Sequence, residues 1–88
     1  MGMPSPVSEA VVHALLLLIV QARKDAGLSQ ERLAELSGVD LGVISRAENL
    51  VRIPGLASIL DLAHALDLDP PSLVAAAIKD AGGKRERG

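Results

Sequence analysis

Three residues separate two short predicted helices in the middle of the chain, and this spacing is the tightest constraint on the fold. Ser29 is a favourable N-cap for a helix over 30–37. Asp40 is a favourable N-cap for a second helix over 41–49. Gly38 supplies the left-handed backbone that ends the first of them. With so short a connection the two helices must turn sharply on each other, so the sequence predicts a helix-turn-helix unit.

Further helices are predicted around this unit, and no strand is predicted. Capping and helix-stopping residues mark their ends, and apolar residues recur on one helical face. The predicted ranges are 8–26, 56–66 and 72–80. The chain of 88 residues is expected to form one all-α domain over 8–81, with a flexible arm over 1–7 and a flexible tail over 82–88.

Composition argues against several kinds of site. The chain has no cysteine, so neither a disulfide nor a thiolate zinc site can form. His13 and His64 fall on different predicted helices without other ligands at metal spacing, so no metal and no cofactor is expected. A glycine-rich phosphate loop and a paired nucleophile are also missing, which predicts that the chain is not an enzyme. A net charge of −2 indicates that any anionic partner is met by a local patch.

One stretch, VVHALLLLIV over 11–20, is strongly apolar. It holds ten residues and runs into Gln21, Arg23 and Lys24, whereas a membrane-spanning helix needs about 20 apolar residues. No cationic segment precedes it, as a secretory signal would require. The sequence therefore predicts no membrane contact and a cytoplasmic location.

Residues 22–74 carry a set of motifs with a known counterpart: RK…GLSQERLAELSGV, ISRAEN and LASILDLAHALDLDPPSL. At these spacings the chain resembles the lambda-repressor-like, Cro/C1-type helix-turn-helix family, also called the XRE family. The resemblance implies an all-α, five-helix fold. It also implies a sequence-specific DNA-binding transcriptional regulator of the repressor type, whose helix 41–49 enters the major groove of double-stranded DNA.

The resemblance assigns roles to individual positions. Arg23 and Glu48 match a buried ion pair between the first and third helices. Gln30 matches a phosphate contact at the start of the second helix. Arg46 is the best candidate for base contact, since its planar fork can pair with guanine. The expected DNA-contacting residues are Gln30, Leu41, Gly42, Val43, Ser45, Arg46, Asn49 and Arg52.

Some positions depart from the family pattern. Leu41, Gly42 and Val43 stand where polar readers are usual, which leaves apolar contact with a thymine methyl group as their means of recognition. Leu50 replaces a glycine at the end of the third helix, and Ile53 replaces a polar residue. Leu41, Gly42 and Val43, together with an acidic pI of about 5.5, favour an alternative: a protein-interaction module of the antitoxin or anti-repressor type on the same scaffold, with a protein partner in place of DNA.

The first predicted helix is apolar around most of its circumference. Such a helix is buried on more than one side, and a domain this small cannot cover every face of it. We therefore expect a homodimer, in which this helix, alone or together with the last predicted helix, packs against a second copy. The expected interface residues are Leu16, Leu17 and Val20.

Overall fold

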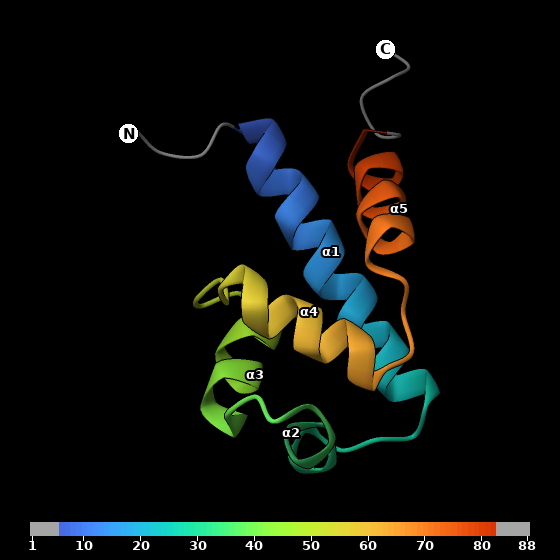
Figure 1. Ribbon diagram of the computed structural model, residues 1–88. Helices are drawn as coiled ribbons and strands as arrows, with labels where there is room; N and C mark the ends of the chain where they lie inside the picture. Colours follow the sequence, from blue (N-terminus) through green and yellow to red (C-terminus); the bar gives the residue numbers. More distant parts are fainter. Residues whose placement is uncertain (1–5, 83–88) are drawn as a thin grey trace.

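A computed structural model describes residues 6–82, and this part of the chain forms five α-helices and no strand (Figure 1). The helices are α1 (Pro6–Asp25), α2 (Gln30–Ser37), α3 (Leu41–Glu48), α4 (Leu56–Ala65) and α5 (Pro70–Gly82). The all-α, five-helix fold predicted from the sequence is confirmed.

The outer helix ends differ from the prediction. α1 begins at Pro6, so Pro6 and Val7 belong to the helix and not to the predicted arm. Proline is tolerated in a first turn, whose N–H groups have no partner within the helix. α5 continues to Gly82, which was predicted to open the tail. The remaining arm and tail residues, including the terminal KRERG, lie outside the described part of the chain.

The caps around the central turn explain why α2 and α3 stop and start where they do. The Ser29 hydroxyl accepts a backbone hydrogen bond of 3.0 Å from the first turn of α2. Asp40 Oδ2 accepts one of 2.9 Å from the N–H of Gly42. Gly38 has φ +78° and donates its N–H to the carbonyl of Ala34 at 2.9 Å, which turns the chain out of α2. The three-residue connection is therefore closed at both ends by hydrogen bonds.

The core is made only of aliphatic side chains. Leu33 of α2, Ile44 of α3 and Leu62 of α4 are its largest fully buried members. Ala47 and Ala63 are also buried, and their small side chains allow close approach of the backbones. The other buried members of this core cluster are Leu15, Leu16, Ile19, Val39, Leu73 and Ala77. Burial of each large aliphatic side chain contributes about 1.5–3 kcal/mol.

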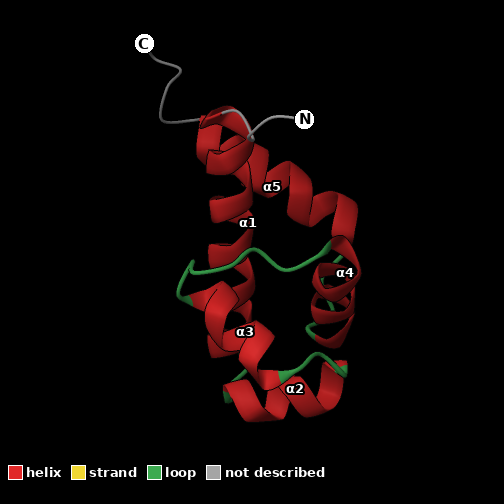
Figure 2. Cartoon of the chain, turned by 90° about the vertical axis from the view of Figure 1, so that its left-hand side faces the viewer, coloured by secondary structure: helices red, strands yellow, loops and turns green. Residues whose placement is uncertain are grey.

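Helices α1 and α5 lie side by side, run antiparallel and extend away from α2 and α3 (Figures 1 and 2). This arrangement corrects the expected dimer interface. Leu16 is only 3% exposed and belongs to the core, and Val20 is half-buried beside Leu33 and Ile44. Leu17 is 57% exposed. The uniform apolar character of the helix did not show which of its sides faces inward.

By length and composition α1 could cross a membrane: it has 20 residues, with a mean hydropathy of 1.4 over its most apolar window. In this structure it has another role. It contributes Leu15, Leu16 and Ile19 to the core, which makes it a structural element of the domain.

We predict that Gly38→Ala lowers the free energy of unfolding by about 1–2 kcal/mol, the cost of a left-handed backbone for a residue with a Cβ. A Cβ at Gly38 would meet no atom within 4 Å, so only the backbone conformation opposes the change. Gly82→Ala is the matched control, because it also has open space and its φ is not left-handed. Denaturant unfolding measures both variants. Equal effects of the two substitutions would contradict the backbone explanation.

Candidate nucleic-acid interface

The carboxylate of Glu48, in α3, links this helix to α1 and α2 through side-chain hydrogen bonds. Arg23 of α1 donates from Nε to Glu48 Oε2 at 2.7 Å and from Nη2 to Glu48 Oε1 at 2.9 Å. Arg23 Nη1 donates to the carbonyl of Leu28 at 2.7 Å. Gln30 Nε2 donates to Glu48 Oε1 at 2.9 Å. The Arg23 and Glu48 side chains are each 11% exposed, so the ion pair expected between the first and third helices is present and largely buried.

Opposing effects set the protonation of this group. Burial raises the pKa of the Glu48 carboxyl, but hydrogen bonds from Arg23 and Gln30 and the charges of Arg23 and Lys24 outweigh it, so the pKa lies below its usual value. The hydrogen bond to Glu48 raises the pKa of Arg23, while burial lowers it to a smaller extent. Glu48 is therefore ionised at neutral pH, and Arg23 is committed to it.

Gln30, expected to contact phosphate, has a structural role in this network. Its side-chain amide bonds Glu48, so that group would have to leave its partner to reach DNA. Its backbone N–H lies in the first turn of α2, at the positive end of the helix dipole. The backbone is thus the better placed part of Gln30 for an anion.

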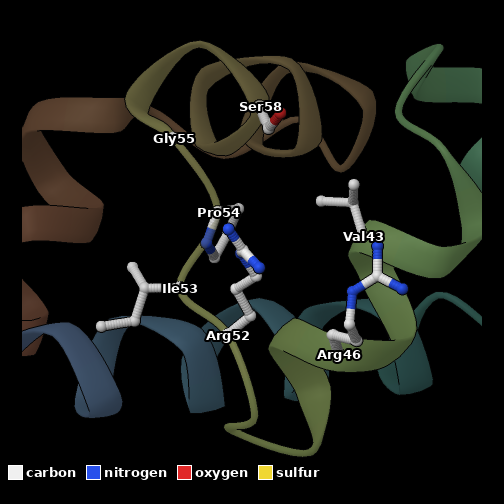
Figure 3. A pocket seen from close by; sticks show the side chains of 7 residues that line it. All are labelled: Val43, Arg46, Arg52, Ile53, Pro54, Gly55 and Ser58. Atoms are coloured by element: carbon white, nitrogen blue, oxygen red, sulfur yellow. The ribbon is translucent and has the colours of Figure 1, made fainter.

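Two arginines outside the network line one hollow. It has a volume of about 240 Å³ and lies between α3, the loop after it and the start of α4. In Figure 3 Arg46 extends from α3 and Arg52 from the loop. Neither side chain has a hydrogen-bonding or ion-pairing partner within residues 6–82. The lining residues are Val43, Arg46, Arg52, Ile53, Pro54, Gly55 and Ser58, and none of them is acidic.

The backbone at the end of α3 brings these arginines together. Leu50 adopts φ +57°, and the next residue, Val51, donates its N–H to the carbonyl of Arg46 at 2.8 Å. The N–H of Arg52 also points to that carbonyl, at 3.3 Å. The leucine at this position therefore takes the left-handed conformation that a glycine would have taken, and the loop folds back beside α3.

The start of α4 adds polar groups to the same hollow. Gly55 is the N-cap of α4 and offers no side-chain hydrogen bond, so the N–H groups of the first turn have no side-chain cap. Ser58, in that turn, places its hydroxyl at the hollow. Two guanidinium groups, a hydroxyl and the positive end of a helix are donors suited to a phosphate oxygen. Sequence reasoning missed Gly55 and Ser58, although a glycine before a predicted helix start was a usable signal.

The remaining expected contact residues are spread along α3 and its end. Leu41 and Gly42 occupy the first turn. Ser45 is half-buried, and its carbonyl accepts a 2.9 Å hydrogen bond from the side-chain amide of Asn49. Asn49 therefore turns back onto its own helix. Of the expected residues, the structure brings Val43, Arg46 and Arg52 together at the hollow.

These features define a helix-turn-helix domain: two short capped helices joined by a tight turn, inside an all-helical fold. The helix-turn-helix family model matches residues 19–73, more than half of the chain. The chain belongs to the Cro/C1-type helix-turn-helix family, also called the XRE family, which is a family of DNA-binding regulator domains. Neither the search of curated proteins nor the search of solved structures found a match.

We predict that Glu48→Gln lowers the free energy of unfolding at pH 7 by about 3 kcal/mol, because it leaves the buried Arg23 without a counter-charge. The depressed pKa of Glu48 means that its ionised form stabilises the fold above the usual glutamate pKa of about 4.3. That contribution is lost as the pH falls through the folded-state value. The variant should therefore lose less stability than the wild type on acidification, as measured by denaturant unfolding between pH 3 and 7.

Arg23→Met removes the other partner of the pair, and its deficit should change with pH in the same direction. Without Arg23, burial dominates and raises the pKa of Glu48, so protonation at low pH relieves the cost of the stranded carboxylate. The deficit of Arg23→Met relative to the wild type should shrink as the pH falls. A deficit independent of pH would show that the pair does not act through charge.

Proposed function

We propose that this chain is a cytoplasmic, sequence-specific DNA-binding transcriptional regulator of the repressor type, with α3 as the major-groove helix. The observation that carries the proposal is the hollow beside α3, where Arg46, Arg52 and the uncapped start of α4 converge without an acidic residue. Family membership supports the same role. A phosphate of the DNA backbone would occupy the hollow while the first turn of α3 faces the bases.

Recognition of bases would rest on few groups. Arg46 is the strongest candidate, since a guanidinium can donate two hydrogen bonds to guanine O6 and N7. Leu41 is exposed and Val43 half-buried on α3, and both side chains suit contact with thymine methyl groups. Gln30 and Ser45 would add phosphate or base contacts, and Asn49 a contact only after leaving its carbonyl.

We predict that Arg52→Ala weakens DNA binding without changing the preferred sequence, because a phosphate contact carries no base information. Its loss should also reduce the slope of log affinity against log salt by about 0.9. Arg46→Ala should weaken binding and relax the preference at one base pair, a discrimination of about 1–3 kcal/mol. Titration of selected and random duplexes at several salt concentrations measures both.

Arg32→Ala is the matched control for these variants. It also removes one positive charge, but Arg32 is an exposed residue of α2 that pairs with Glu35 at 2.8 Å. Its affinity should stay close to that of the wild type. A loss equal to that of Arg52→Ala would mean that overall charge, and not the hollow, governs binding.

We also propose that the regulator acts as a homodimer through the α1/α5 apolar surface, defined by the exposed residues Val7, Leu17, Val74 and Ile78. Two hollows of about 320 and 490 Å³ adjoin along this helix pair, and both are lined by Ala10 and Ala81. A second copy would cover this surface and double the phosphate contacts. The two copies of α3 would then face half-sites about one helical turn of DNA apart.

We predict that Ile78→Glu shifts the protein to monomer, because it places a charge on the proposed contact surface beside Val7. Sedimentation equilibrium at micromolar concentration measures the change. Leu36→Glu is the control: Leu36 is also an exposed leucine-sized residue, but it lies on α2, at the opposite end of the molecule (Figure 1). A monomeric wild type, or a dimer that survives Ile78→Glu, would refute this interface.

A second candidate is a protein-interaction module of the antitoxin or anti-repressor type. Exposed apolar residues around the α3–α4 loop favour it: Leu50, Val51, Ile53 and Leu56. Such a module would bind a protein through these side chains and leave DNA unbound. Absence of any duplex binding by the wild type at low salt would select this candidate over the first.

A further inference from the structure

Gly42, the second residue of α3, lies directly beneath the side chain of Arg46. A Cβ placed on Gly42 would lie 3.1 Å from Arg46 Nη1 and 3.3 Å from Arg46 Nη2. It would also lie 3.0 Å from Asp40 Oδ2, the carboxylate that caps the helix. The guanidinium of Arg46 therefore packs over the backbone of Gly42, and a Cβ at position 42 would require Arg46 and Asp40 to move by a few tenths of an ångström.

Helix geometry accounts for this contact. Residues four apart lie on the same face, and long side chains in a helix point back toward its amino terminus. Arg46 thus extends along α3 toward the first turn, where Asp40 caps the helix and Gly42 has no side chain to occupy the space. Glycine destabilises a helix by about 1 kcal/mol relative to alanine. Gly42 thus lowers the intrinsic stability of α3 but leaves room for the guanidinium of Arg46.

We propose that Gly42 is a specificity-determining position that acts through Arg46, by holding the guanidinium over the first turn of α3. This inference rests on the proposed DNA-binding function. The hydrogen-bond donors of Arg46 then lie where a side chain at residue 42 would otherwise contact a base. The Arg46 side chain thus covers both position 42 and position 46 on the DNA-facing side of α3. A side chain longer than a methyl group at residue 42 would fill this space and move the guanidinium of Arg46 away from the first turn, while Arg46 would still line the hollow that it shares with Arg52.

The positioning is tested first in the protein without DNA. In NMR spectra of the free chain, nuclear Overhauser contacts between the Gly42 α-protons and the Arg46 side chain are expected in the wild type. In Gly42→Leu the contacts from the α-proton of residue 42 to the Arg46 guanidinium end should be lost, because the longer side chain fills the space over the first turn, while the rest of α3 keeps its shifts. Gly82→Leu, at a position where a Cβ meets nothing within 4 Å, should leave the contacts of Gly42 with Arg46 intact. A wild type without these contacts would overturn the proposal.

A double-mutant cycle then tests the effect on recognition. Gly42→Leu should weaken binding to the selected wild-type site about tenfold and change the preferred base pair opposite the first turn. In an Arg46→Ala background, Gly42→Leu should cost less affinity, because the part of its effect that passes through Arg46 is already lost. Denaturant unfolding of each variant separates binding from folding. Equal losses in both backgrounds would assign Gly42 a merely structural role and overturn the proposal.

The two parts of the test separate this inference from the function on which it rests. If the wild type binds no duplex, the DNA-binding function fails, and with it the role of Gly42 in specificity. The NMR contacts still decide whether Gly42 places Arg46. If the wild type binds DNA and Gly42→Leu keeps the same affinity and preference, the function stands and this inference alone is wrong.

Discussion

The ion pair between Arg23 and Glu48 is the interaction on which the rest of the structure depends. Its two short hydrogen bonds fix the direction of α3 relative to α1, and Gln30 ties the start of α2 to the same carboxylate. A largely buried pair of this kind determines orientation more than it adds net stability. It also withdraws Arg23 from the cations available to DNA. The positive charge at the hollow beside α3 therefore comes from Arg46 and Arg52.

The arrangement separates two kinds of surface along the molecule. The cationic hollow lies among α3, the following loop and α4, whereas the exposed apolar residues of α1 and α5 lie along a helix pair that extends away from α2 and α3 (Figures 1 and 2). Polyanion binding and self-association would then not compete for the same residues. Residues 23–52 hold five basic and five acidic side chains. The position of each arginine therefore matters more for binding an anion than the net charge of this segment.

Local features of this chain were readable from the sequence, and features that depend on distant parts were not. Caps such as Ser29 and Asp40 act on their own first turn, so the starts of α2 and α3 followed directly. The pairing of Arg23 with Glu48 came from the family resemblance. The inward side of α1 could not be read, because Leu16 and Leu17 are chemically alike and only the packing of α3 and α5 distinguishes them. The hydrogen bond of Gln30 to Glu48 could not be read from the sequence either, because it depends on how α2 and α3 pack. The same holds for the hollow, which depends on how the chain folds back after α3.

The left-handed conformation of Leu50 has a consequence for the motion of the loop. A glycine at this position would adopt both positive and negative φ in the free protein, and binding would have to restrict its backbone to one of them. A leucine has far fewer accessible basins, so the segment that carries Arg52 is already close to a single shape before a ligand arrives. The left-handed backbone of Leu50 costs about 1 kcal/mol or more, and folding provides this energy before any ligand binds. The loop therefore loses less conformational entropy when a ligand binds.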